Sequence, residues 1–66
     1  MTPLETAIEK AGGQAALGRA IAVPQPLVWY WLHQAKHVPA EHCAAIEEAT
    51  GVSRHDLRPD IFGETP

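Results

Sequence analysis

Residues 14–33 read QAALGRAIAVPQPLVWYWLH, and this stretch decides the fold that we expect. Apolar residues recur at helical spacing on both sides of a break. Pro24 marks the break, because the residue before a proline is pushed away from helical geometry. The first half predicts a helix over 14–21. The second half predicts a helix that begins at Pro24 and frays near 33–36, with both early prolines in its first turn.

The spacing within this stretch is typical of a helix-turn-helix. Two helices that cross steeply need a small residue where their backbones approach, and Gly18 stands in the middle of the first helix. The residues predicted to face the core are Leu17, Ala20, Ile21, Val23, Val28, Trp31 and Leu32. Ala22 stands where the turn needs a left-handed residue, a conformation that costs alanine roughly 1 kcal/mol. We therefore expect a somewhat altered turn.

A helix start precedes the motif. Thr2 is placed as the N-cap, Pro3 as the first helical residue, and Glu5 as the reciprocal partner of a capping box. Gly12-Gly13 ends this helix, since glycine takes the left-handed C-terminal conformation without strain.

The chain after the motif predicts two further helical segments. The first covers 39–50, with Cys43, Ile46 and Ala49 as its buried stripe and Gly51 at its end. The second is a single turn that a capping box at 53–56 opens and Pro59 ends. Ile61 and Phe62 are expected to fold back over the core. The sequence thus predicts one all-α domain of five helices over 1–62, followed by a flexible tail over 63–66.

Size and charge restrict the possible functions. A chain of 66 residues with 45% hydrophobic residues supports one small core. It has no apolar run as long as the ~18 residues of a membrane span, and one cysteine fits a reducing cytoplasm, where we expect the protein to lie. The net charge is −3, yet residues 10–40 contain no Asp or Glu. This asymmetry favours one face suited to a polyanion.

Several motifs together resemble the YdaS and Cro group of phage-type repressors. They are Gly13–Leu17, Val28-x-x-Trp31-Leu32, Val38–Cys43, Ala45–Glu47, Ala49–Gly51 and Ser53–Phe62, and the resemblance covers residues 3–62. It implies a lambda-repressor-like domain that binds double-stranded operator DNA as a homodimer. Some Cro proteins form a β-hairpin in their C-terminal half, but the helical periodicity of 39–51 favours the all-helical form.

Carried over position by position, the resemblance implies a set of DNA contacts. The side chains expected in the major groove are Gln25, Pro26, Trp29 and Tyr30, with Pro24 or Leu27 at the rim. Those expected at phosphates are Gln14, Arg19 and Lys36, with Lys10 as a further candidate. Apart from the resemblance, His33 and His37 are expected to flank a phosphate near the end of the second motif helix. Gln25 can pair bidentately with adenine. The other groove residues offer few hydrogen bonds, so specificity rests on Gln25 and on apolar contacts.

Other classes of site find little support. His33, His37, His42 and Cys43 do not predict a metal site, because Pro39 interrupts the run and no second cysteine follows. With no nucleophile–base pair and no glycine-rich phosphate loop, we expect no enzyme, no cofactor, and neither a membrane nor a small-molecule substrate as partner.

The sequence therefore predicts a sequence-specific transcriptional repressor that binds a pseudo-palindromic operator as a weak homodimer. One alternative is the antitoxin or autoregulator of a toxin–antitoxin pair. Another is a protein-interaction module, which the net acidity and the adjacent Trp29 and Tyr30 favour.

Overall fold

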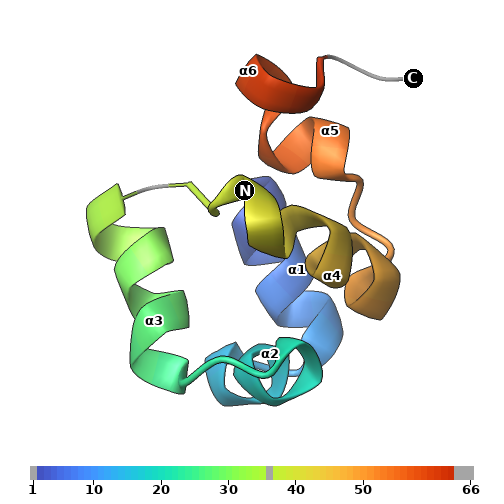
Figure 1. Ribbon diagram of the computed structural model, residues 1–66. Coiled ribbons are helices and arrows are strands. Elements are labelled where there is room, and N and C mark those ends of the chain that lie inside the picture. Colours follow the sequence, from blue (N-terminus) through green and yellow to red (C-terminus); the bar gives the residue numbers. More distant parts are fainter. Residues whose placement is uncertain (1, 36, 64–66) are drawn as a thin grey trace.

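The computed structural model describes residues 2–35 and 37–63, and all regular structure in these residues is helical (Figure 1). The elements are α1 (Pro3–Ala11), α2 (Gln14–Ile21), α3 (Gln25–Tyr30), the π-helical segment η1 (Trp31–Ala35), α4 (Ala40–Thr50), α5 (Arg54–Leu57) and α6 (Pro59–Phe62). The predicted all-α class is confirmed. The predicted count of five is wrong, because the described residues form six α-helices. Residues 64–66 of the predicted tail lie outside the described residues.

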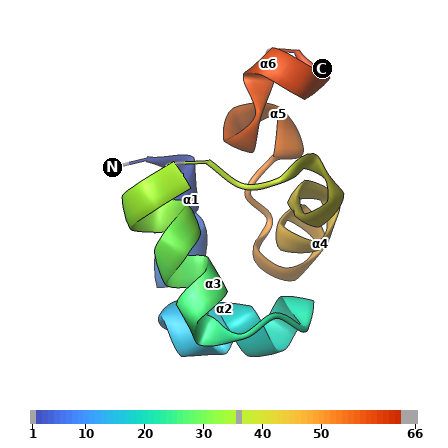
Figure 2. The same cartoon turned by 60° about the vertical axis from the view of Figure 1, so that its left-hand side comes forward.

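The helices are arranged around α2, which packs against α1, α3 and α4. In two views related by a rotation, α2 lies at one end of the molecule, and α5 and α6 lie at the other (Figures 1 and 2). The α3 helix packs chiefly on α2, and η1 continues it along one side. Among the residues described, no helix has the length and apolar character needed to cross a membrane.

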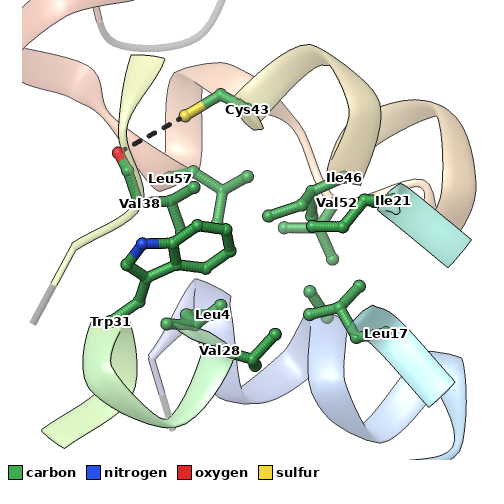
Figure 3. Close-up of a cluster of buried hydrophobic side chains, with 11 residues drawn as sticks. Leu4, Leu17, Ile21, Val28, Trp31, Val38, Cys43, Ile46, Val52 and Leu57 are labelled. Carbon is green, nitrogen blue, oxygen red and sulfur yellow. Dashed lines mark hydrogen bonds between the residues drawn. The ribbon is translucent and has the colours of Figure 1, made fainter. Parts of the chain in front are cut away.

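The core gathers around Trp31, the first residue of η1. Figure 3 shows its indole among Leu4, Val38 and Leu57, which come from three other parts of the chain. Trp31 is 2% exposed. The other buried apolar residues are Leu4, Ala7, Leu17, Ile21, Val28, Val38, Cys43, Ile46, Val52 and Leu57. The predicted inward positions are confirmed except for Ala20 and Ala49, which are exposed.

The two motif helices cross at Gly18, as predicted. A Cβ atom at this position would lie 2.7 Å from the carbonyl oxygen of Val23, so only glycine fits here without a shift of the backbone. The following turn has the ordinary geometry, and our expectation of an altered turn is wrong. Ala22 adopts the left-handed conformation with φ 62° and ψ 43°, and it bears the strain itself. The Val23 N–H then donates to the Gly18 carbonyl at 2.8 Å.

The capping box at the start of α1 is confirmed. The Thr2 hydroxyl accepts a hydrogen bond from the Glu5 N–H at 3.1 Å, and the Glu5 carboxylate accepts one from the Thr2 N–H at 2.9 Å. Gly12 ends α1 in the left-handed conformation, also as predicted. These bonds satisfy backbone groups that a helix end otherwise leaves unpaired.

Two helices begin one residue later than predicted. Pro24 and Pro39 are the N-caps of α3 and α4, with extended backbones at ψ 147° and 144°. Each cap carbonyl accepts the first hydrogen bond of its helix, from Leu27 and from His42. The sequence predicts that the second motif helix frays near residues 33–36. At residues 33–35 this is wrong, because the helix continues as η1.

The closing segment, residues 53–63, differs most from the prediction. Pro59 begins α6 instead of ending a turn, since proline suits the first position of a helix. Ser53 caps α5, because its hydroxyl accepts a hydrogen bond from the His55 N–H. The other half of the predicted capping box, in which the Asp56 carboxylate accepts from the Ser53 N–H, is not found among the described residues. Phe62 packs against the core as expected, whereas Ile61 is 49% exposed because α6 turns it outward.

Candidate nucleic-acid interface

The first residues of the two motif helices meet. Gln14 begins α2 and Gln25 begins α3, and the Gln25 Nε2 donates a hydrogen bond to the Gln14 Oε1 at 2.8 Å. The close crossing at Gly18 permits this contact, since a Cβ atom there would lie 3.5 Å from the backbone nitrogen of Gln25. The structure thus joins two residues with different predicted roles, a phosphate contact for Gln14 and a base contact for Gln25.

This bond leaves a defined set of polar groups. Gln25 keeps its carbonyl oxygen and one amide hydrogen, which together form one acceptor and one donor. Adenine presents the complementary pattern in the major groove, through its N6 amino group and N7. Gln14 keeps both amide hydrogens, which suit an anionic oxygen. The glutamine pair therefore presents groups of the kinds that pair with a base edge and with a phosphate.

The outer face of α3 is mainly apolar. Gln25 and Pro26 are exposed, as are Trp29 at 44% and Tyr30 at 51%. Trp29 and His33 lie one turn apart, with ring centroids 4.7 Å from each other and an interplanar angle of 42°. The structure thus places all four predicted base-reading side chains at the surface of one short helix, and it pairs one of them with His33.

The candidate phosphate contacts are more dispersed. Arg19 is exposed in the last turn of α2. His33 lines a surface cavity of about 270 Å³ together with Glu5 and His37. Hydrogen bonds with Thr2 lower the pKa of the Glu5 carboxyl, and His33 contributes a smaller electrostatic effect. Lys36 lies outside the described residues, so its role stays a prediction.

Sequence reasoning missed Arg58, which holds the loop after η1. Its Nη1 donates to the Val38 carbonyl at 2.9 Å, and its Nε and Nη2 donate to the Asp60 carboxylate at 3.0 and 2.8 Å. The start of α6 is thereby tied to the loop that joins η1 to α4. The sequence signal was the run Arg58-Pro59-Asp60. A proline in this position suits the start of a helix, and the acid that follows it lies two residues from the arginine.

Cys43 has a structural environment. Its thiol is buried and donates weakly to the Val38 carbonyl at 3.8 Å (Figure 3). The Pro39 carbonyl is a second weak acceptor at 3.5 Å. Burial raises the pKa of this thiol, which favours the protonated form over the thiolate that metals and electrophiles require. Within residues 2–35 and 37–63, no three His, Cys, Asp or Glu side chains lie close enough to hold a metal ion.

Comparison with known proteins identifies a curated relative. The chain is 46% identical over 52 residues to a protein of Escherichia coli strain K12 named "putative transcriptional regulator YdaS". The match covers 76% of this chain and 53% of YdaS, so the chain spans about half the length of this curated relative.

Two solved structures are also similar. The Cro protein Xfaso 1 of Xylella fastidiosa strain Ann-1 is 38% identical and superposes with a TM-score of 0.89, covering 96% of this chain and 98% of the other. XPH1, a hybrid sequence of the Cro proteins Xfaso 1 and Pfl 6, is 39% identical with a TM-score of 0.63 over the same shares of each chain. The relatives are thus named as a transcriptional regulator and as Cro proteins.

A protein-family model described as bacterial toxin YdaS matches residues 4–66. This match covers nearly the whole chain and includes both motif helices. The resemblance that the sequence motifs indicated is thereby confirmed, and the protein belongs to the YdaS family.

Proposed function

We propose that this protein is a DNA-binding transcriptional repressor of the Cro type, with α3 as the recognition helix in the major groove. The hydrogen bond between Gln14 and Gln25 carries this proposal, because it presents an adenine-reading group and a phosphate-binding group side by side. The acid-free stretch from α2 to η1, with Arg19 exposed, gives this face a charge suited to DNA. The regulator and Cro names of its relatives support the same function.

The repressor binds a pseudo-palindromic operator as a homodimer. Each subunit places one α3 in the major groove, so the two half-sites lie about 34 Å apart on one face of the duplex. The dimer is weak without DNA, because few large apolar side chains of the described residues stay exposed, and two of them lie on the recognition helix. DNA then favours assembly by mass action. Sedimentation at micromolar concentration, with and without operator DNA, measures this equilibrium.

Fluorescence anisotropy with labelled duplexes tests the repressor function. The protein should prefer duplexes enriched from a random pool over scrambled ones, and its affinity should fall as salt rises. Gln25→Ala should cost ~1–3 kcal/mol of binding and relax the preference at one base pair. Arg19→Ala should weaken binding to all sequences alike.

Gln34→Ala is the matched control, since Gln34 is an exposed glutamine of η1 outside the predicted contact set. It should leave affinity unchanged. Equal binding to enriched and scrambled duplexes, or binding independent of salt, would overturn the repressor function. A stable complex with a protein partner in the absence of any DNA shift would instead favour an interaction module.

A second candidate is a member of a toxin–antitoxin pair. The description of the matching family as a bacterial toxin favours it, whereas the alternative that the sequence offered was the antitoxin or autoregulator of such a pair. Controlled expression in a bacterial host separates the two roles. Growth arrest by the wild type and equally by Gln25→Ala would support a toxin that acts without base reading. Rescue of growth from the product of a neighbouring gene would support an antitoxin.

A further inference from the structure

The outer face of α3 carries an apolar patch, which we define as Pro26, Trp29 and Tyr30. All three residues are exposed, and they follow Gln25 on the same helix. The Trp29 ring contacts the His33 ring in a tilted arrangement, with centroids 4.7 Å apart, so its indole has a preferred position on the surface. Folding does not explain this patch, because the buried side of the same helix is formed by Val28 and the adjoining Trp31.

The recognition helix also lacks the side chains that read guanine. Arginine and lysine are the usual bidentate partners of guanine O6 and N7. Residues 20–35 contain neither of them, and this range includes all of α3 and η1. In the major groove the apolar feature of a base edge is the C5 methyl group of thymine. Gln25 independently matches adenine, the partner of thymine, so the polar and apolar groups of the helix select the same base pair.

We propose that this apolar patch selects operator half-sites by contacting thymine methyl groups, with Trp29 as the main specificity-determining residue. The inference rests on the proposed function, and it names the half-site as rich in A·T pairs. Deoxyuridine differs from thymidine only by the missing methyl group. Each contacted methyl therefore contributes about fourfold to affinity, which corresponds to burial of one such group.

The test uses the full chain and the tightest duplex enriched from a random 20-base-pair pool. This duplex is synthesised again with deoxyuridine in place of every thymidine, and both forms are titrated by anisotropy. We expect the uracil form to bind at least about fourfold more weakly. In Trp29→Ala the difference between the two forms should shrink toward one. In Arg19→Ala both affinities should fall while their ratio stays as in the wild type.

The outcomes separate this inference from the function beneath it. Equal affinity for the thymine and uracil forms overturns the inference and leaves the repressor function standing. A ratio that persists unchanged in Trp29→Ala, with the variant folded by circular dichroism, assigns the effect to the shape of the DNA and also overturns the inference. Failure to enrich any duplex overturns the repressor function and the inference together.

Discussion

Apolar packing holds both the motif helices and the closing segment, whose Leu57 is part of the core, but the closing segment adds charged hydrogen bonds. In the motif, α2 and α3 approach through a glycine and bury apolar side chains such as Leu17 and Val28. In the closing segment, charged side chains also form hydrogen bonds with the backbone and with each other. Arg58 bonds to Val38 and Asp60, while Glu47 accepts from the N–H and the Nε of Arg54 at 2.7 and 3.2 Å.

This difference predicts how each region responds to change. Apolar packing depends on shape and little on pH, whereas charged hydrogen bonds depend on the protonation of their carboxylates. Loss of shape in the motif should therefore destabilise the whole small domain. Loss of charge should act mainly on the closing segment and on its hydrogen bond to Val38 in the loop before α4.

Replacement of Trp31 by alanine should have the largest effect. The indole is almost fully buried, and loss of a buried tryptophan costs ~3–5 kcal/mol. A domain of this size has little more stability than that, so we expect the variant to be largely unfolded at 25 °C. Trp29→Ala, two residues away on the exposed face, is the matched control, and it should change stability by less than ~0.5 kcal/mol. Urea titration followed by circular dichroism measures both, and equal losses would contradict the assignment of the two tryptophans.

Gly18→Ala should have the next largest effect. The new methyl group would meet the Val23 carbonyl at 2.7 Å, and such overpacking costs ~1–3 kcal/mol. Alanine is otherwise favoured over glycine inside a helix by about 1 kcal/mol. The two effects oppose each other, so the sign of the measured change in stability shows which one is larger. The reverse change, Ala20→Gly, lies on the exposed side of α2 and should cost about 0.5–1 kcal/mol. A Gly18→Ala variant more stable than the wild type would contradict the close crossing.

The same contrast explains what the sequence could predict of the fold. Helical periodicity, caps and small residues act within one helix or across one turn, so α1, α2 and the inward face of α3 were predicted correctly. The closing segment depends on partners far along the chain. Arg58 donates a hydrogen bond to the carbonyl of Val38, twenty residues away, and no local sequence pattern predicts such a bond. The errors over Pro59 and Ile61 follow, because the direction of α6 depends on these contacts.

The candidate site divides in a similar way. Exposure of Trp29 and Tyr30 followed from the burial of Val28 and Trp31, because helical rotation fixes one face once the other is known, whereas Gln25 and Pro26 were placed by the family resemblance. The bond between Gln14 and Gln25 could not be predicted, since it depends on how steeply two helices cross.

Acid should weaken the closing segment by protonating the two carboxylates that accept hydrogen bonds from its arginines. The hydrogen bond from Arg58 lowers the pKa of Asp60, and the bonds from Arg54 lower the pKa of Glu47. A lowered pKa in the folded state means that the stabilisation is full above the ordinary values of 3.8 and 4.5 and is lost as pH falls through the folded values. We therefore expect the Tm to decline below about pH 4.5.

Arg58→Met is the control for this acid response. It keeps an unbranched apolar stem but removes the partner of Asp60, so the pKa of Asp60 should rise toward its ordinary value. The Tm of the variant should start lower at pH 6 and decline less steeply between about pH 4.5 and 2 than that of the wild type. Glu5, whose pKa Thr2 lowers, keeps part of the acid response in both proteins. Parallel Tm profiles for the two proteins would contradict the role given to Arg58.

Ala22→Gly should have the smallest effect, with the opposite sign. At φ 62° the alanine side chain is strained by roughly 1 kcal/mol, and glycine relieves that strain. The greater freedom of glycine in the unfolded chain opposes part of the gain, so we expect a net stabilisation of about 0.5 kcal/mol. The Ala20→Gly variant again supplies the control, because in regular helix the same substitution should destabilise. If both variants lose stability equally in urea titration, the turn does not hold Ala22 in the left-handed conformation. If only Ala22→Gly gains stability, the strain at Ala22 is real, and the packing of the motif offsets it in the wild type.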